Sequence, residues 1–206
     1  MGGNLTMKKI GVLAVQGAVR EHVKMLNQLA DVQGVAVKYE RELDEIDGLI
    51  IPGGESTAIG RLLRDFGLLE PLKARIEAAL PVWGTCAGMI LLAKKLVDDE
   101  TVHLGVMDVV VARNGYGRQL GSFETTVNVP GVADDEIPLA FIRAPYVSSA
   151  GSGVDVLLEL EGRIVACRQG HMLATAFHPE ITNDLSFHQY FVKMIGESCV
   201  VEKVRG

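Results

Sequence analysis

The chain has 206 residues, of which 48% are hydrophobic and 22% are charged, and its formal net charge at pH 7 is −6. These proportions are typical of one soluble globular domain, and without a basic cluster neither nucleic acid nor an anionic membrane surface is an expected partner. No apolar run approaches the roughly 20 residues that a transmembrane helix needs.

The N-terminal stretch MGGNLTMKK lacks the apolar core of a signal peptide, so secretion is not expected. We expect residues 1–7 to be a leader or disordered and residues 8–203 to form a single domain. The three cysteines, Cys86, Cys167 and Cys199, form neither a disulfide framework nor a CxxC metal pattern. This cysteine usage predicts a cytoplasmic location and no metal site, with Cys167 and Cys199 structural.

The first half of the chain alternates strand-like apolar runs with helical patterns. The expected strands cover residues 9–15, 35–39, 48–52 and 81–83. The expected helices cover residues 18–30, 56–65 and 69–80. Such alternation predicts a parallel sheet whose two faces are both covered by helices.

After residue 104 the pattern changes to short strand-like runs separated by turn signals such as NGYG and EGR. These runs cover residues 106–112, 123–129, 139–144, 154–160, 163–169 and 172–177, and an amphipathic helix over 185–197 follows. We therefore expect one α/β domain whose parallel core gains antiparallel strands in its second half. Ligands of such sheets bind beyond the carboxyl ends of the strands, where Gln16, the PGGES loop and Cys86 are expected.

The stretch GTCAG places one cysteine between two glycines, after a predicted strand and before a helical pattern that continues to Leu96. This is the layout of a nucleophile elbow, in which glycines allow a sharp turn and the backbone of the nucleophile is strained. A helix that begins at Ala87 favours the thiolate form of Cys86 and offers the Ala87 N–H to an oxyanion. By itself the pattern also fits a structural cysteine.

Of the five histidines, His178 is the one that ends a predicted strand and begins the tripeptide His-Pro-Glu. Pro179 favours an extended backbone at His178, and residues i and i+2 of an extended segment point to the same side. We therefore expect the Glu180 carboxylate to reach the imidazole of His178 and to orient it as the base for Cys86. Alone, the tripeptide also fits an ordinary turn.

At these motifs the sequence resembles the class I (triad) glutamine amidotransferases, most closely their vitamin B6 branch, the glutaminase subunits of pyridoxal 5′-phosphate synthase. The resemblance extends from about Lys8 to the last predicted helix. It rests on the stretches GVLAVQGAVREH, DGLIIPGGEST, WGTCAGMILLAK, ARNGYGRQ, FIRAP and AFHPEIT.

The resemblance implies a flavodoxin-like three-layer αβα fold and hydrolysis of L-glutamine to glutamate and ammonia by a Cys86–His178–Glu180 triad. It implies an L-glutamine site at Gly54, Glu55, Ser56, Arg113, Ile142 and Arg143. It further implies an oxyanion hole at Gly53, Gly54 and Ala87, and a docking and gating region at Gln16 and Gly17. The implied partner is the synthase subunit, in a hetero-oligomeric complex, and no cofactor is expected.

Other interpretations stay open at this point. Arg113 and Arg143 also fit solvated arginines or arginines paired with a nearby acid. The enzyme could be the glutaminase subunit of another amidotransferase, for example one that feeds histidine or aminobenzoate synthesis, or a γ-glutamyl hydrolase. A non-catalytic thiol-sensing protein on the same fold, with Cys86 as its redox centre, is the alternative from a different functional class.

Overall fold

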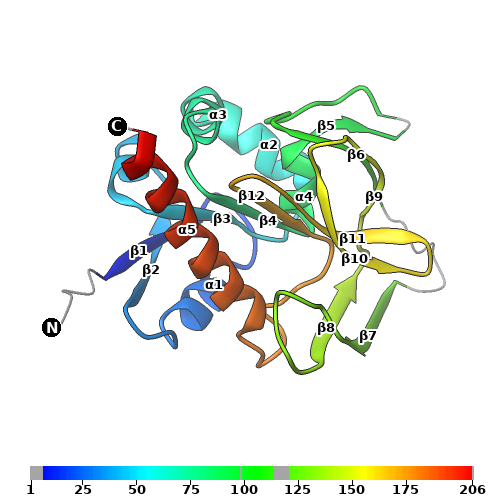
Figure 1. Cartoon of the computed structure of the whole chain (residues 1–206). Coiled ribbons are helices and arrows are strands. Elements are labelled where there is room, and N and C mark those ends of the chain that lie inside the picture. Colours follow the sequence, from blue (N-terminus) through cyan, green and yellow to red (C-terminus); the bar gives the residue numbers. More distant parts are fainter. Residues whose placement is uncertain (1–6, 98, 114–120, 206) are drawn as a thin grey trace, which may run out of the picture.

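A ten-stranded mixed sheet forms the centre of the computed structural model, which describes residues 7–97, 99–113 and 121–205 (Figure 1). The strands of its first half are β1 (Lys8–Leu13), β2 (Val32–Val37), β3 (Gly48–Ile51), β4 (Val82–Thr85) and β5 (Ala93–Leu96). Those of its second half are β6 (Met107–Ala112), β9 (Tyr146–Ala150), β10 (Asp155–Leu160), β11 (Arg163–Gln169) and β12 (Met172–Thr175).

The parallel part of the sheet has the order β2-β1-β3-β4-β12. This is the flavodoxin-like order 2-1-3-4-5, with β12 in the place of the fifth strand. Strands β3, β4 and β12 are buried along their whole length, because both faces of the sheet are covered there, whereas the edge strand β2 alternates between buried and exposed positions. The predicted α/β class and flavodoxin-like architecture are therefore confirmed.

Helices lie on both sides of the sheet, as Figure 1 shows. They are α1 (Val19–Leu26), α2 (Ser56–Asp65), α3 (Leu69–Glu77), α4 (Ala87–Leu92) and α5 (Ser186–Arg205), with a 3₁₀ helix η1 at Glu40–Glu45. The helices α1 and α5 share one face, where Trp83 of β4 packs against Phe187 and Phe191 of α5. Burial of such large apolar side chains stabilises the fold by about 1.5–3 kcal/mol each.

The second half of the chain adds the predicted antiparallel strands. From β12 the sheet continues through β11, β9 and β6, with successive antiparallel pairs, and β10 pairs with β11. A separate two-stranded sheet consists of β7 (Ser122–Val127) and β8 (Ile137–Ile142). This small sheet contacts the loop after β12, where Ala140 of β8 accepts a hydrogen bond of 2.8 Å from the backbone N–H of His178.

Two local predictions are wrong. The helical pattern after Cys86 ends at Leu92, and residues 93–96 form strand β5, which pairs in parallel with β6. Strand pairing outweighs helical propensity here, and it buries Ala93 and Leu96 while the two lysines between them stay exposed. Strand β12 ends at Thr175, so His178 lies in the loop beyond the strand rather than at its last position.

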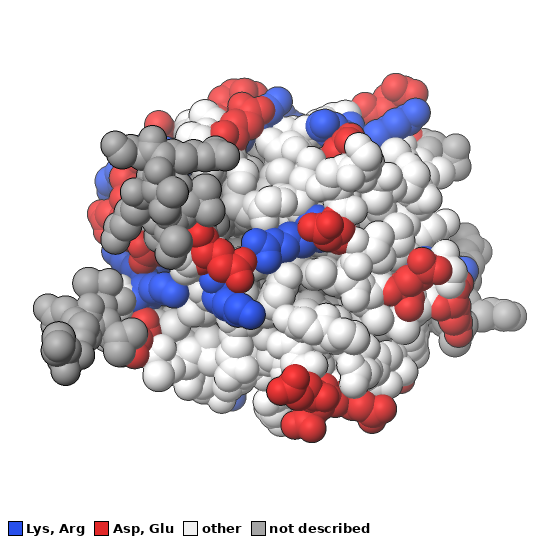
Figure 2. Space-filling model, viewed as in Figure 1, with Lys and Arg blue, Asp and Glu red and all other residues white. Residues whose placement is uncertain are grey.

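The expected leader at residues 1–6 and most of the RNGYGRQ stretch, residues 114–120, lie outside the described residues. The side chain of Cys199 lies outside them as well. On the face of the molecule shown in Figure 2, acidic and basic side chains are interspersed, and no extensive basic patch is seen among the described residues. The described helices include none that is long and apolar enough to cross a membrane.

Candidate active site

Cys86 occupies a strained turn between β4 and α4. Its backbone has φ 49° and ψ −102°, a left-handed region that a residue with a side chain rarely adopts. The Cys86 N–H donates a 2.8 Å hydrogen bond to the Thr175 carbonyl of β12, and α4 begins at the next residue, Ala87. The neighbouring strand therefore holds the strained turn in place at the carboxyl edge of the parallel sheet.

The two glycines beside Cys86 are needed for close packing and not, as predicted, for the sharp turn. Neither has a positive φ, so the turn itself does not need their freedom. A Cβ at Gly84 would lie 2.5 Å from the Gly88 carbonyl, and a Cβ at Gly88 would lie 2.2 Å from the Ile51 carbonyl oxygen. The glycines are needed because α4 packs backbone to backbone against β4 and the end of β3.

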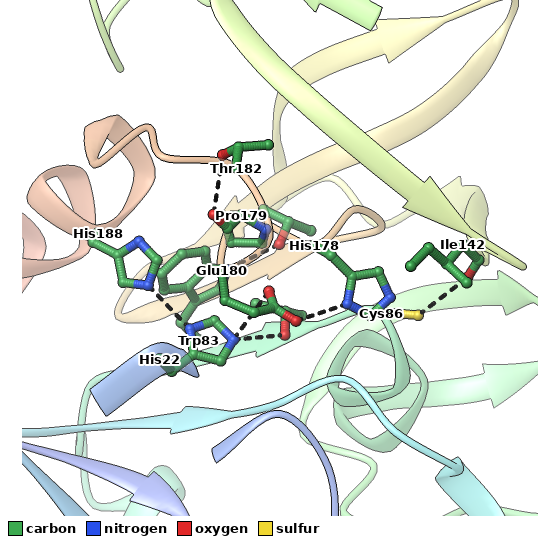
Figure 3. Close-up of polar contacts among 11 residues, drawn as sticks. His22, Trp83, Cys86, Ile142, His178, Pro179, Glu180, Thr182 and His188 are labelled. Carbon is green, nitrogen blue, oxygen red and sulfur yellow. Dashed lines mark hydrogen bonds and ion pairs between the residues drawn. The ribbon is translucent and has the colours of Figure 1, made fainter. Parts of the chain in front are cut away.

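The imidazole of His178 contacts the Glu180 carboxylate, with 2.8 Å between Nδ1 and Oε1 (Figure 3). The predicted extended geometry is wrong, however, because residues 178–181 form a turn in which the Ile181 N–H donates to the His178 carbonyl at 3.3 Å. Pro179 occupies the second position of that turn, which suits its fixed φ. The turn, rather than strand alternation, brings the two side chains together.

His178 carries the most informative pKa of the site. Burial lowers this pKa, but the interactions of the imidazole with Cys86 and Glu180 outweigh burial and raise it from 6.5 to about 10. A Cβ at Gly53 would lie 2.5 Å from His178 Cε1 and 3.4 Å from Cys86 Cβ, so the loop at Gly53 lies close to both side chains. His178 is thus suited to remain protonated near neutral pH.

A cavity of about 590 Å³ opens in front of Cys86 and His178. Its volume is within the range usual for small-molecule sites. The cavity brings together all of the sequence-predicted site residues except Glu180, which lies behind His178. The lining residues are Gln16, Gly17, Ala18, Gly53, Gly54, Glu55, Ser56, Thr57, Cys86, Ala87, Ile90, Arg113, Ile142, Arg143 and His178.

The PGGES loop is tied to the turn between β1 and α1 by two hydrogen bonds. The Glu55 N–H donates to Gln16 Oε1 at 2.9 Å, and the Ala18 N–H donates to the Gly53 carbonyl at 3.1 Å. Ser56, the first residue of α2, is buried beside this loop. A change in the β1–α1 turn would therefore be transmitted directly to the loop.

Gly17 and Gly54 make these loop contacts possible. Gly17 has φ +112°, and a Cβ there would lie 2.1 Å from the Gly53 carbonyl oxygen. A Cβ at Gly54 would lie 2.4 Å from Gln16 Oε1. A larger residue at position 17 would push the loop away from the turn, and one at position 54 would displace the Gln16 side chain.

Arg113 is paired with an acid and also faces the cavity. Its Nη1 lies 3.1 Å from Asp99 Oδ2. Its Nε and Nη2 are buried and have no hydrogen-bond partner within the described part of the chain. Because these two nitrogens are inaccessible to solvent, they become available to a ligand in the cavity only if the side chain moves.

Ile142 and Arg143 form the cavity wall contributed by the end of β8. The Ile142 carbonyl oxygen lies 3.9 Å from Cys86 Sγ, and the Ile142 side chain is exposed. Arg143 has φ 44°, and its N–H donates to the Gly121 carbonyl at 2.6 Å. A second strained backbone position thus adjoins the nucleophile.

Sequence reasoning did not assign His22 or His188 to the site, but the structure places both behind the triad (Figure 3). His22 Nε2 lies 3.3 Å from Glu180 Oε2, and His22 Nδ1 lies 3.0 Å from His188 Nε2. The available signal was position: α1 follows β1 at the carboxyl edge of the sheet, so a histidine in its first turns lies near that edge.

Cys167, the other cysteine whose side chain the structure describes, has surroundings unlike those of Cys86. Cys167 of β11 is fully buried, and burial raises its pKa to about 12. Such a thiol forms little thiolate and reacts slowly, as expected of a structural cysteine. No group of three or more potential metal ligands is found in the described ranges.

Comparison with known proteins defines the class. Residues 12–197 match the SNO glutamine amidotransferase family. The chain is 62% identical over 189 residues to the pyridoxal 5′-phosphate synthase subunit PdxT of Ruminiclostridium cellulolyticum, which covers 92% of this chain and 100% of that protein. The identity to the protein of the same name from Thermoanaerobacter sp. strain X514 is 52% over 186 residues, or 90% of this chain and 98% of that protein. The chain therefore belongs to the SNO glutamine amidotransferase family.

Solved structures agree with this assignment. A crystal structure of a glutamine amidotransferase is 43% identical and superposes with a TM-score of 0.85, covering 91% of this chain and 98% of that one. The structure of PurLQS from Thermotoga maritima includes a chain that is only 14% identical but has a TM-score of 0.63, with 91% of this chain and 99% of that one covered. The second similarity supports the fold alone, whereas the first extends to the family.

Proposed function

We propose that this chain is the glutaminase subunit of pyridoxal 5′-phosphate synthase, which hydrolyses L-glutamine and passes ammonia to the synthase subunit. The names and near-complete coverage of the most similar relatives support the assignment. One structural observation carries the chemistry: His178 and Cys86 both lie beside Gly53 at the wall of a substrate-sized cavity, and the His178 imidazole contacts Glu180 on the side away from the cavity. This is the nucleophile–base–orienter arrangement of a triad.

In the first half of the reaction, the Cys86 thiolate attacks the side-chain carboxamide carbon of glutamine. A C–S bond forms, and the carbonyl π electrons move to oxygen, where backbone groups of Gly53, Gly54 and Ala87 stabilise the negative charge. The imidazolium of His178 gives its proton to the departing nitrogen. The C–N bond breaks, ammonia leaves, and a glutamyl thioester remains.

In the second half, water replaces ammonia. His178, now neutral, takes a proton from the attacking water, and the new oxyanion forms in the same backbone site. Collapse of this intermediate breaks the C–S bond, releases glutamate and regenerates the thiolate beside a protonated His178. Glu180 keeps the imidazole in one orientation throughout and supports its positive charge.

The substrate is held by residues around the cavity mouth. Arg113 lines the cavity, and its guanidinium is suited to the α-carboxylate of glutamine. The other proposed contacts come from the PGGES loop and the end of β8, at Gly54, Glu55, Ser56, Ile142 and Arg143. Together these groups fix the carboxamide against Cys86, which supplies the benefit of proximity.

In this proposal the synthase docks on the β1–α1 turn. Gln16 and Gly17 lie at the cavity, and Gln16 holds the backbone N–H of Glu55. A partner bound to this turn can therefore reorient the oxyanion loop without contributing a catalytic group. Loss of one oxyanion donor typically costs about 10²–10³-fold in rate. Reorientation of one loop peptide can therefore change the rate enough to switch the enzyme on.

The test is a glutamine-to-ammonia assay of the full chain with and without the synthase component of pyridoxal 5′-phosphate synthase. We expect this synthase to stimulate hydrolysis, and the synthase of an unrelated amidotransferase to have no effect. Stimulation only by a different synthase would identify another glutaminase subunit, and full activity without any partner would favour a γ-glutamyl hydrolase. Glutamine hydrolysis in the complex that is insensitive to Cys86→Ala would contradict the triad. The cytoplasmic location stays a prediction.

A further inference from the structure

A buried row of polar side chains continues from the triad into the protein interior (Figure 3). Behind Glu180 it passes to His22 of α1, at 3.3 Å from Oε2 to Nε2, and then to His188 of α5, at 3.0 Å from His22 Nδ1 to His188 Nε2. His22 and His188 lie 166 positions apart in the chain, and both are fully buried. Neither histidine is the nucleophile, the base or the orienting carboxylate of the triad.

Packing fixes the orientation of both imidazoles. The ring of Trp83 meets His22 edge-on at 5.8 Å between centroids and meets His188 edge-on at 5.0 Å. The indole is itself held by a 3.0 Å hydrogen bond from its Nε1 to Thr175 Oγ1. The two histidines therefore have little room to rotate, and a fixed donor direction is what a positioning group requires.

Glu180 needs a donor on this side. Its Oε2 is buried and has no partner with hydrogen-bond geometry in the described ranges, although His22 Nε2 is within 3.3 Å. The Thr85 hydroxyl lies 3.4 Å from the same nitrogen. A buried carboxylate oxygen without a donor is costly, so a proton on His22 Nε2, shared between Thr85 and Glu180, stabilises the ionised carboxylate.

The proton positions along the row follow from this requirement. Burial lowers the pKa of His22 and lowers that of His188 to about 4, so each ring carries a single proton near neutral pH. If that proton of His22 is on Nε2, its Nδ1 is an acceptor for the Nε2–H of His188. The opposite arrangement would direct a nitrogen lone pair of His22 at the carboxylate and leave a buried N–H of His188 unpaired, because His188 Nδ1 has no partner in the described chain.

We infer that His22, oriented by His188, is a positioning residue for Glu180: it donates from Nε2 to the second carboxylate oxygen, so that the first is directed at His178. The inference rests on the proposed function, because it concerns the same triad. The groups that face this row are His22 from α1, Thr85 from the end of β4, Cys86 from the β4–α4 turn, His178 and Glu180 from the loop after β12, and His188 from α5. Without this donor the Glu180 carboxylate is free to turn away from His178, and it then stabilises the protonated imidazole less.

The test compares His22→Leu with His22→Gln in the complex, at a saturating concentration of the synthase so that docking is not limiting. For His22→Leu we expect kcat to fall about 10- to 100-fold, the effect of a lost buried hydrogen bond to a charge, with KM for glutamine within about twofold. The alkaline limb of the pH–rate profile should move to lower pH, because the pKa of His178 falls when Glu180 supports it less. His22→Gln, whose amide can donate near the Nε2 position, should recover kcat to within about fivefold of the wild type.

His171→Leu is the matched control. His171 also has a ring nitrogen bonded inside the protein, to the Ile76 carbonyl at 2.7 Å, but it precedes β12 at the opposite end of the sheet from the triad. A general loss of stability would change melting temperature in both leucine variants. The altered kcat and pH profile should occur in His22→Leu alone.

A second measurement is independent of whether a variant folds. Nitrogen NMR of the wild-type chain with ¹⁵N-labelled histidine should show His22 as the Nε2–H tautomer at pH 7, and the Nδ1–H tautomer would overturn the inference. So would wild-type kcat and pH profile in His22→Leu, or no recovery in a folded His22→Gln. Absence of glutamine hydrolysis in the wild-type complex would instead refute the proposed function, and the tautomer would still decide the positioning role.

Discussion

Behind Glu180 the polar groups of this site are buried, packed against Trp83 and fixed by one another, whereas in front of Cys86 they line an open cavity. The rear groups come from helices and a strand end in the protein core. The front groups come from the PGGES loop, from Arg113 and from the end of β8. The two regions therefore have different roles: the rear sets the protonation and orientation of His178, and the front binds substrate. Substitutions behind the triad should then change kcat and its pH dependence, and substitutions of substrate-binding side chains in front should change KM.

The largest effect is expected at the junction of the two regions. Glu180→Gln keeps the shape of the side chain but removes the charge that raises the pKa of His178. We expect kcat to fall about 10⁴-fold, with KM nearly unchanged, as for loss of the third member of other triads. Because the pKa of His178 drops below about 10, the alkaline limb of the pH–rate profile moves to lower pH. A KM effect as large as the kcat effect would contradict this separation of roles.

Gly53 lies where the PGGES loop packs against His178, so a substitution there tests the contact between the front and the rear of the site. A Cβ in Gly53→Ala would lie 2.5 Å from His178 Cε1, so either the imidazole or the oxyanion loop must move. We expect a fall of about 10²-fold in kcat, the size of a lost oxyanion donor, measured in the complex. Gly153→Ala is the control, because a Cβ there meets no atom within 4 Å and φ is not positive. Equal activities of the two variants would show that the loop tolerates the displacement.

Arg113→Ala tests the front of the site. Arg113 lines the cavity, so removal of its positive charge should weaken binding of the glutamine carboxylate. We expect KM to rise about 10- to 100-fold, the cost of a charged hydrogen bond, while kcat at saturating glutamine changes little. Arg61→Ala, which removes an exposed partner of Asp65, serves as the control. An unchanged KM in Arg113→Ala would mean that Arg113 serves only to pair with Asp99.

The smallest effect concerns stability at the rear. Burial lowers the pKa of His188 to about 4, so between pH 6.5 and 4 the unfolded chain binds a proton that the native chain does not. The free energy of unfolding contributed by His188 is therefore present above pH 6.5 and is lost as the pH falls toward 4. From pH 7 to pH 5, urea unfolding of the wild type should lose about 1–2 kcal/mol more than that of His188→Phe. Equal losses would mean that His188 is already charged in the native state.

Several features of this protein could be predicted because they depend on neighbours in the chain. The nucleophile turn GTCAG and the tripeptide His-Pro-Glu are contiguous, and the alternation of apolar runs with helical patterns indicates the parallel sheet directly. The contact between His178 and Glu180 was predicted from local spacing, although a turn and not an extended strand creates it. Residues two positions apart are close in almost any backbone conformation, so the contact could be predicted even though the conformation was not.

Features that depend on how elements pack were not predictable in the same way. Strand β5 takes its conformation from pairing with β6, and Gly84 and Gly88 are required by a helix that lies on two strand ends. Both requirements come from segments that are distant in the chain, so the flanking residues do not reveal them.

By itself, then, the amino-acid sequence determined the fold class, the strained cysteine turn and the His-Pro-Glu pair, because each follows from local geometry and periodicity. Only the tertiary structure decided that His22 and His188 meet behind Glu180. Each histidine fits an ordinary helix pattern, and no periodicity encodes the packing of α1 beside α5 on one face of the sheet. The burial of the two histidines and the distances between their rings are fixed only when α1 and α5 pack on the sheet.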